Sequence, residues 1–274
     1  MPAGAPGTVA TAAALPAPPV FTAPATWRSI DFISDLHLSE AMPRTFAALA
    51  AHLDATGADA VFILGDLFEL WVGDDARSQP FAARCIDLLA RAGRRLHLAV
   101  MTGNRDFLIG SSLLAACHAH ALPDPTLLVA FGRRVLLSHG DALCLADRDY
   151  QAFRAQVRDA AWQRSFLARP LPQRLAMARE IRQASHASQM RRQFDGALAA
   201  DADRTEATAW LRAANAATLV HGHTHRPGSE AWPGGFERHV LSDWDLDAAA
   251  RAEVLRLDAG GFTRVPPAGL AAAC

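Results

Sequence analysis

The sequence contains no lysine, and all 27 of its basic residues are arginines. Without lysine, the chain cannot use a P-loop lysine to hold nucleotide phosphates, a Schiff-base lysine or a lysine general base. The formal net charge is only -1, which argues against a protein that coats nucleic acid, so no nucleic-acid partner is expected. These absences leave functions that need neither a lysine side chain nor a strongly basic surface.

Cysteines and long apolar runs are also scarce. The four cysteines, Cys85, Cys117, Cys144 and Cys274, show no CxxC spacing and suggest no disulfide framework, which fits a reducing compartment. Charged residues or histidines interrupt every apolar run before it reaches the roughly 18 residues that a membrane span needs. We therefore expect a cytoplasmic protein whose only membrane contact is peripheral.

The first 27 residues contain no charged side chain and are rich in alanine, proline and threonine. A secretory signal needs a basic segment before an unbroken apolar segment, and prolines stand in both places here. We expect residues 1–27 to form a disordered tail and residues 267–274 to form a short tail at the other end.

Five β-rich runs each end in a polar cluster, and helical patterns separate the early ones. The runs are "SIDFISDLH" (29–37), "AVFILGD" (60–66), "LHLAVMTGN" (96–104), "RVLLSHGD" (134–141) and "ATLVHGHTH" (217–225). This alternation of strand, loop and helix predicts an α/β fold. Functional residues of such folds gather beyond the carboxyl ends of the strands, where all five polar clusters stand.

The pattern becomes purely helical between the fourth and fifth runs. Two stretches, "DRDYQAFRAQVRDAAWQRSFLA" (147–168) and "QRLAMAREIRQASHASQMRRQF" (173–194), predict a two-helix insertion. After residue 226, "ERHVLSDWD", "AEVLRLD" and "GFTRV" alternate as three further strands. We therefore expect a core formed by residues 28–146 and 197–266, with residues 147–196 as the insertion.

The polar clusters supply seven side chains that are typical of a metal centre. They are Asp35, His37, Asp66, Asn104, His139, His223 and His225. The two side chains of a D-x-H or H-x-H pair on an extended segment project to the same side, so each pair can bind one ion. Oxygen and imidazole ligands suit Mn²⁺, Fe or Zn²⁺. Seven ligands are too many for one tetrahedral ion, so the set predicts two ions that share a bridging carboxylate.

One histidine of "HGHTH" is expected to stand apart from the ligands. His221 precedes Gly222 and lies one step deeper in the strand than the other two imidazoles. We expect His221 to pack against its neighbours or to support a ligand.

The seven candidate ligands gain weight from their number. A single cluster of this kind would indicate no more than a turn or a solvent-exposed histidine, whereas five in succession indicate a dinuclear site.

The order DLH, GD, GN, HGD, GHTH over about residues 28–245 resembles the calcineurin-like metallophosphoesterase superfamily. The resemblance implies a four-layer α/β/β/α sandwich of two mixed sheets, with the insertion as a helical lid. It implies one metal on Asp35, His37, Asp66 and His225, and a second on Asp66, Asn104, His139 and His223, so that Asp66 bridges. Such a pair of metals activates water and neutralises phosphate oxygens, which predicts phosphoester hydrolysis.

Arg105, in "GNRDFL" (103–108), narrows the kind of phosphoester. Many members of the superfamily have a histidine there, which is thought to assist an alkoxide leaving group. An arginine stays protonated and so makes a poor general acid, but it holds phosphate oxygens well. A phosphate monoester, whose second pKa is about 6, can leave without a proton. Unless the change is neutral drift, Arg105 favours cleavage of a pyrophosphate bond.

"GNRDFL", with "GDLFELWVGDD" (65–75), "HGDALCLADRDYQAFR" (139–154) and "HGHTHRP" (221–227), is similar to the UDP-2,3-diacylglucosamine diphosphatases, a family of bacterial lipid A biosynthesis. The resemblance implies two Mn²⁺ per chain and hydrolysis of UDP-2,3-diacylglucosamine to UMP and lipid X (2,3-diacylglucosamine 1-phosphate), with water attacking the α-phosphorus. It implies catalytic roles for Asp66, Asn104, Arg105 and His223, and substrate contacts at Asn104, Arg105, Asp147, Ser185, Gln189, Arg192 and His223. Better-known relatives carry Asn and Lys in place of Gln189 and Arg192.

The insertion is basic as well as helical. From Arg148 to Arg192 it has ten arginines against three acidic residues, with apolar side chains between them. This composition suits an anionic lipid and an anionic membrane surface. By resemblance it is the lid over the acyl chains of a monomer on the cytoplasmic face of the inner membrane. An ordinary solvated hairpin, a broad phosphodiesterase or nucleotide phosphatase, and a silent metal-binding scaffold remain as alternatives.

Overall fold

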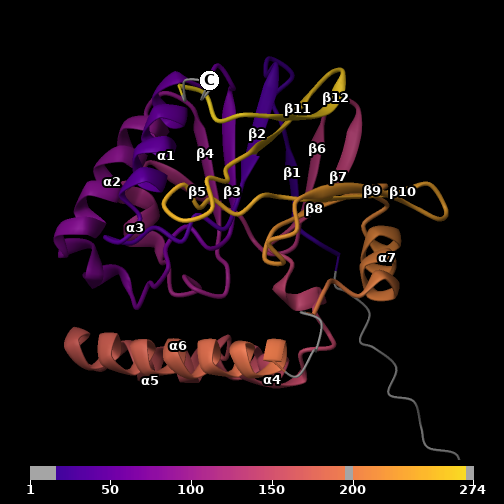
Figure 1. Cartoon of the computed structure of the whole chain (residues 1–274). Helices are drawn as coiled ribbons and strands as arrows, with labels where there is room; N and C mark the ends of the chain where they lie inside the picture. Colours follow the sequence, from indigo (N-terminus) through magenta and orange to yellow (C-terminus); the bar gives the residue numbers. More distant parts are fainter. Residues whose placement is uncertain (1–16, 195–199, 270–274) are drawn as a thin grey trace, which may run out of the picture.

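Two six-stranded mixed β-sheets pack face to face in the computed structural model of the chain (Figure 1). The structure describes the backbone of residues 17–194 and 200–269, and the side chains of these residues except 184–194. The first sheet has the order β12-β11-β2-β3-β4-β5, and the second has the order β1-β6-β7-β8-β10-β9. The predicted α/β fold with two mixed sheets is therefore confirmed.

The strands of the first sheet are β2 (Ser29–Ile33), β3 (Ala60–Leu64), β4 (His97–Met101), β5 (Ala119–Ala121), β11 (Val254–Asp258) and β12 (Gly261–Val265). Those of the second are β1 (Val20–Thr22), β6 (Thr126–Ala130), β7 (Arg133–Ser138), β8 (Thr218–His221), β9 (Gly228–Trp232) and β10 (Phe236–Val240). The outer face of the first sheet carries α1 (Pro43–Ala55), α2 (Pro80–Gly93) and α3 (Ser111–Ala116), and that of the second carries α7 (Arg204–Ala213) (Figure 1). The result is a helix, sheet, sheet, helix sandwich.

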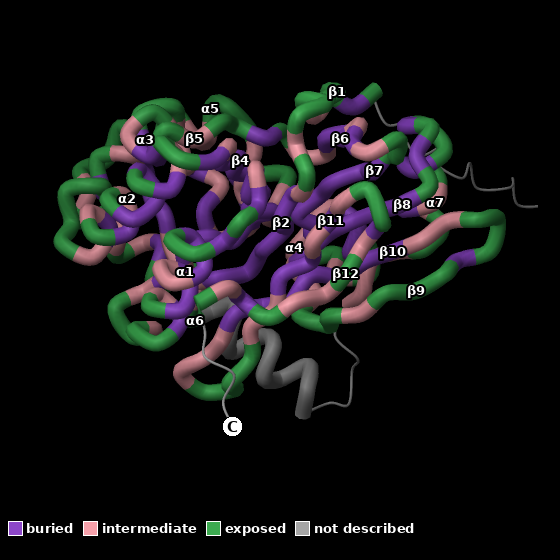
Figure 2. Tube along the Cα trace, turned by 90° about the horizontal axis from the view of Figure 1, so that it is seen from above, coloured by how far each residue is buried: buried purple, intermediate pink, exposed green. Residues whose placement is uncertain are grey.

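Alternation along β3 shows how one strand serves two cores. Phe62 and Leu64 point into the apolar layer between the sheets, whereas Val61 and Ile63 point toward α1 and α2. Both faces are covered, so every residue of β3 is buried, as Figure 2 shows for the central strands. Each such large side chain contributes roughly 1.5–3 kcal/mol by leaving water. The sheets are thus a rigid support for the loops at their ends.

The parallel strands bring the polar clusters to one edge. β2, β3 and β4 are parallel neighbours in the first sheet, as are β7 and β8 in the second. Their carboxyl ends therefore open on the same side of the sandwich. The three helices of the insertion form a separate layer beneath the two sheets in Figure 1.

The insertion contains three helices where the sequence predicts two. They are α4 (Arg148–Val157), α5 (Ala160–Leu167) and α6 (Leu171–Phe194). The stretch predicted as one helix over 147–168 breaks at Arg158 and Asp159, because Asp159 has an extended backbone and its carboxylate accepts a hydrogen bond from the Trp162 N–H. An aspartate in this position caps a new helix. Whether the insertion is a separate lid domain with bounds at 147 and 196 stays a prediction.

The prediction of a disordered tail through residue 27 is wrong for residues 17–27. β1 pairs in parallel with β6, and the ring of Phe21 lies edge-on to Phe62 at 5.4 Å between centroids. Trp27 packs on the same ring at 6.5 Å. Prolines are tolerated just before an edge strand, so the proline-rich composition hides a strand that adds two aromatic rings to the core. Residues 1–16 lie outside the described part.

Removing the ring of Phe21 tests whether β1 packs on the core. We expect Phe21→Ala to lower the free energy of unfolding by about 1.5–3 kcal/mol, less than a fully buried Phe→Ala costs because Phe21 is only half-buried. Val20→Ala, at the adjacent exposed position, should change it by about 0.5 kcal/mol or less. Urea denaturation followed by circular dichroism gives both values, and equal effects of the two variants would contradict the packing of β1.

Candidate active site

All seven predicted ligands lie at the shared edge of the sheets. Asp35 and His37 follow β2, Asp66 follows β3 and Asn104 follows β4, while His139 follows β7 and the pair His223 and His225 follows β8. Segments as distant as residues 35 and 225 thus meet in one place. The geometry described next shows how closely these side chains lie.

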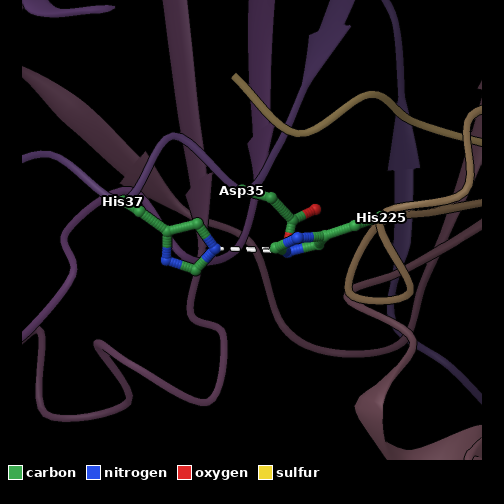
Figure 3. Close-up of side chains that lie close together, drawn as sticks. All are labelled: Asp35, His37 and His225. Carbon is green, nitrogen blue, oxygen red and sulfur yellow. Dashed lines mark hydrogen bonds and ion pairs between the residues drawn. The ribbon is translucent and has the colours of Figure 1, made fainter. Parts of the chain in front are cut away.

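Asp35, His37 and His225 form the first group. The Nε2 atoms of the two imidazoles are 3.3 Å apart, and His225 Nε2 is 3.4 Å from Asp35 Oδ1. Figure 3 shows both rings turned toward the carboxylate. Two nitrogens that bind one cation at about 2.0–2.1 Å with a tetrahedral angle lie about 3.4 Å apart. The first group therefore has the spacing of a cation site.

Asp66 and His139 extend the cluster to a second group that also includes Asp35. Asp66 Oδ2 is 3.9 Å from His37 Nε2 and 3.7 Å from His139 Nε2. One carboxylate oxygen thus stands between an imidazole of each group, as a bridging ligand must. Asp35 belongs to both groups, so two buried carboxylates border the space between His37 and His139.

The amide of Asn104 joins the remaining histidine to this centre. It lies 3.0 Å from His139 Nε2 and 2.9 Å from His223 Nδ1. With its nitrogen on the ring side, it donates to both rings and to Asp66 Oδ2, and its oxygen accepts from Arg105 Nε at 3.2 Å. A cation would select the opposite orientation, because the amide oxygen is the atom that binds hard metal ions.

The backbone at the site is held in an unusual conformation. The φ angle is positive at Asp35 (53°), His37 (46°), Asp66 (53°), His223 (66°) and His225 (52°). Side-chain-bearing residues seldom adopt this left-handed region, and such strain gathers at functional sites. Five of the seven predicted ligands carry it, so the loops are shaped for side-chain placement at a cost in stability.

Two glycines make room for the carboxylates. A Cβ atom at Gly103 would lie 2.1 Å from Asp66 Oδ1, and one at Gly222 would lie 2.3 Å from Asp35 Oδ2. Both distances are far below van der Waals contact. The glycines of "GN" and "GHTH" are therefore required where they stand because a carboxylate of the neighbouring loop passes over each of them.

Partners behind the imidazoles are features that the sequence analysis missed. His139 Nδ1 lies 2.9 Å from the Leu64 carbonyl oxygen, His37 Nδ1 lies 3.1 Å from Glu69 Oε2, and His225 Nδ1 lies 3.6 Å from Asp243 Oδ2. Each partner leaves the Nε2 atom free to face the cluster, as is usual behind metal-binding histidines. The "E" of "GDLFE" and the first "D" of "SDWD" are the only traces of two of them in the sequence.

Asp106, also missed, ties two of the loops together. Its buried carboxylate accepts hydrogen bonds from the N–H groups of Gly103 (2.7 Å), Leu67 (2.8 Å) and Phe68 (3.3 Å). Burial and the nearby charge of Asp66 raise its pKa to about 6. This aspartate fixes the loop after β4 against the loop after β3, and thereby Asn104 against Asp66.

The electrostatics of the centre favour a bound cation. Burial raises the pKa of Asp35, but the hydrogen bond from His225 and the charge of His139 outweigh it and hold that pKa far below its usual range. Burial lowers the pKa of His139, yet Asp66 and Asp35 raise it to about 9. Burial and His139 lower the pKa of His223 to about 4. Protons on imidazoles here balance carboxylates that divalent cations would balance better.

The other residues predicted to contact the substrate differ in how much of their surroundings the structure describes. Arg105 is half-buried beside the cluster, and its backbone N–H donates to Asp66 Oδ1 at 2.8 Å. Asp147 caps α4 by accepting from the Tyr150 N–H at 3.3 Å. Ser185, Gln189 and Arg192 belong to the backbone of α6, but their side chains lie outside the described residues.

His221 lies apart from the ligands, as the sequence analysis expects. It is fully buried, and its Nε2 accepts a hydrogen bond from Arg238 Nε at 2.9 Å. Arg238 in turn pairs with Asp201. Burial and the Arg238 charge lower the pKa of His221 to about 3, so the ring is neutral and acts as an acceptor within the fold.

Several arginines of the insertion hold it to the loops of the site. Arg154 pairs with Asp141 at 2.8 Å, and Arg158 donates to the Gly103 carbonyl oxygen at 2.9 Å. Arg174 pairs with Asp75, and Arg182 pairs with Glu69. Much of the positive charge that the sequence suggested for an anionic ligand thus docks the insertion onto the core.

Known proteins that are similar to this chain provide evidence that does not depend on the geometry of the site. The family model described as calcineurin-like phosphoesterase matches residues 28–227. The UDP-2,3-diacylglucosamine hydrolase of Ralstonia nicotianae is 44% identical over 268 residues, covering 93% of this chain and 97% of the relative. The proteins of that name from Chromobacterium violaceum (44% identical, 87% and 98% covered) and Stenotrophomonas maltophilia (41%, 85% and 96%) are similar over nearly the same length.

The number of metal ions bound per chain tests the predicted bridging role of Asp66. We expect the purified protein to bind two Mn²⁺ per chain and Asp66→Ala to bind at most one, because the substitution removes a ligand from both positions. His221→Gln, which changes the histidine that lies apart, should retain two. Elemental analysis after gel filtration provides the numbers, and two tightly held ions in Asp66→Ala would contradict the bridging role.

Proposed function

Because the chain belongs to the calcineurin-like phosphoesterase family, we propose that it hydrolyses the pyrophosphate bond of UDP-2,3-diacylglucosamine to UMP and 2,3-diacylglucosamine 1-phosphate (lipid X), a step of lipid A biosynthesis. The observation that carries the substrate is the 44% identity, over 93% of the chain, with a relative named for it. The reaction type is supported by the seven clustered ligands.

Two divalent cations, which we propose to be Mn²⁺, would be held by the clustered side chains. One would take Asp35, His37, Asp66 and His225, and the other Asp66, Asn104, His139 and His223. The donor set of carboxylates, one amide and imidazoles fits such ions, as does the 3.3 Å spacing of the His37 and His225 nitrogens. When bound, the cations lower the pKa of water toward about 7 and neutralise phosphate oxygens.

Arg105 supplies the phosphate contact that the protein itself can make. Burial lowers the pKa of its guanidinium, but an arginine remains a cation throughout the physiological range and so donates without exchanging a proton. In our proposal it holds the departing phosphate while water attacks the α-phosphorus. The leaving phosphate monoester needs no proton, because its second pKa is about 6.

The insertion supports a lipid substrate and contact with a membrane surface. Its exposed large apolar side chains include Leu167 (42% exposed) and Ile181 (38%), and Leu145 (43%) lies just before α4. Exposed arginines such as Arg148 and Arg164 stand on the same layer. No helix in the described part of the chain could cross a membrane. We propose that the layer covers the acyl chains and rests against the cytoplasmic face of the inner membrane, with the protein acting as a monomer.

Hydrolysis in ¹⁸O-labelled water tests reaction and direction of attack together. We expect the Mn²⁺-loaded protein to release UMP from UDP-2,3-diacylglucosamine, with the label in UMP and none in the lipid phosphate. Mass spectrometry of both products gives the answer. Label in the lipid phosphate would contradict attack at the α-phosphorus. Faster turnover of bis-p-nitrophenyl phosphate than of the lipid would favour a broad phosphodiesterase instead.

The role of Arg105 has its own test. We expect Arg105→Gln to lower kcat about 10²-fold or more with both metals retained, as removal of one preorganised donor does elsewhere. Arg105→Lys should recover part of the loss, because a lysine keeps the charge but not the two-pronged geometry. Steady-state kinetics beside metal analysis separates this from metal loss, and an unchanged kcat in Arg105→Gln would refute the contact.

A further inference from the structure

Two histidines of the first metal group have a carboxylate and an arginine behind them. Glu69 lies behind His37 and pairs with Arg182. Asp243 lies behind His225 and pairs with Arg251. The two chains of contacts have the same chemistry, imidazole to carboxylate to guanidinium, so they form a natural comparison within one molecule.

The two chains differ in where the arginine comes from. Arg251 belongs to the loop before β11, outside the insertion, and its backbone pairs with that of Asp245. Arg182 belongs to α6, the longest helix of the insertion. Of these two chains of contacts, only the one through Glu69 therefore connects its imidazole to the layer of helices under the site.

We propose that Glu69 positions His37 for the metal and, through Arg182, makes metal binding and docking of α6 mutually stabilising. The inference rests on the proposed metal centre and concerns a residue pair to which the proposed reaction assigns no role. Glu69 and Arg182 are positioning residues, since neither lies among the clustered ligands.

The first step of the coupling is the choice of tautomer on His37. A carboxylate 3.1 Å from Nδ1 favours the proton on that atom and leaves the Nε2 lone pair facing Asp35 and Asp66. The contact is short but not straight enough to make a regular hydrogen bond.

The second step is the hold of Arg182 on Glu69. The carboxylate of Glu69 is about a third exposed and without its partner would be free to turn toward solvent. Arg182 keeps one oxygen occupied through its Nε, while the other oxygen faces His37. A charge-assisted pair of this kind fixes geometry as well as charge.

Coupling of this kind is reciprocal. If the position of α6 strengthens the hold of His37 on a cation, a bound cation must by the same free energy strengthen the hold of α6 on the core. The other polar contacts between this helix and the core in the described residues lie two turns earlier, where Arg174 reaches Asp75 and the Val72 carbonyl oxygen, while apolar packing on the core continues to Met177 and Ala178. One turn beyond Ala178, the contact with Glu69 holds the segment near Arg182 to the core.

Mn²⁺ binding and hydrogen exchange of α6 test the proposal in the full-length protein. We expect Glu69→Gln to weaken the binding of the tighter Mn²⁺ by about 10–100-fold, as loss of a histidine-orienting partner does elsewhere. Arg182→Met should weaken it by about fivefold or more. Saturating Mn²⁺ should slow amide exchange over residues 171–183 in the unmodified protein, and this slowing should be lost in both variants.

Two further variants serve as matched controls. Asp243→Asn breaks the equivalent contact behind His225, so it should weaken Mn²⁺ binding and still leave the metal-dependent slowing of α6 at saturation. Arg179→Met removes an exposed arginine of the same helix and should alter neither quantity. In the double variant of Glu69→Gln and Arg182→Met, affinity should be no lower than in Glu69→Gln alone, because Arg182 acts through Glu69.

The outcomes separate this inference from the proposed function. If the unmodified protein bound no Mn²⁺, both would be overturned. Two results would overturn only the coupling, provided that the unmodified protein binds Mn²⁺. The first is an affinity of Glu69→Gln for Mn²⁺ within twofold of that of the unmodified protein. The second is amide exchange of α6 that Mn²⁺ still slows in Arg182→Met. Should Glu69→Gln fail to fold by circular dichroism, Arg182→Met, which changes a half-exposed side chain, carries the same test.

Discussion

Two buried carboxylates, Asp35 and Asp66, set the constraint on which this structure depends. They stand within reach of the same imidazoles, and neither has access to solvent to dissipate its charge. Burying a charge is tolerable only when an opposite charge compensates it. The left-handed loops, the glycines beneath the carboxylates and the supporting Asp106 can each be understood as means of holding these two groups where cations would neutralise them.

Arginines of the insertion contact the loops around this centre. A guanidinium offers several donors in a fixed plane and so suits carboxylates and carbonyl oxygens at once. Arg158 reaches the loop of Gly103, Arg154 reaches Asp141 beside His139, and Arg182 reaches Glu69 behind His37. The insertion is thereby fastened to three of the loops that carry ligands, so its position and the shape of the centre depend on each other. Docking of the insertion and placement of the predicted ligands are parts of one arrangement.

The ligand-bearing loops could be predicted from sequence because their positions follow from local rules. Polar residues directly after parallel strands must meet at one edge of a sheet. The alternation expected within "DLH" and "HTH" does not hold, because both residues of each pair have a left-handed backbone and not an extended one. The strand around Phe21 could not be foreseen in the same way, since proline-rich flanks hide it and only contact with Phe62 makes it stable. The helix break at Asp159 was missed because a single aspartate fits the polar face of a helical pattern, although aspartate favours a cap over a helix interior.

Glu69, Asp106 and Asp243 escaped prediction for a different reason. Their importance lies in atoms they meet from other loops, and sequence spacing says nothing of such meetings. The central claim, that Asp66 bridges two cations, can be checked most directly by electron paramagnetic resonance of the protein loaded with two Mn²⁺. We predict the spectrum of a magnetically coupled pair, collapsing to that of isolated ions when only one equivalent is added. Spectra of independent ions at full loading would contradict the bridge.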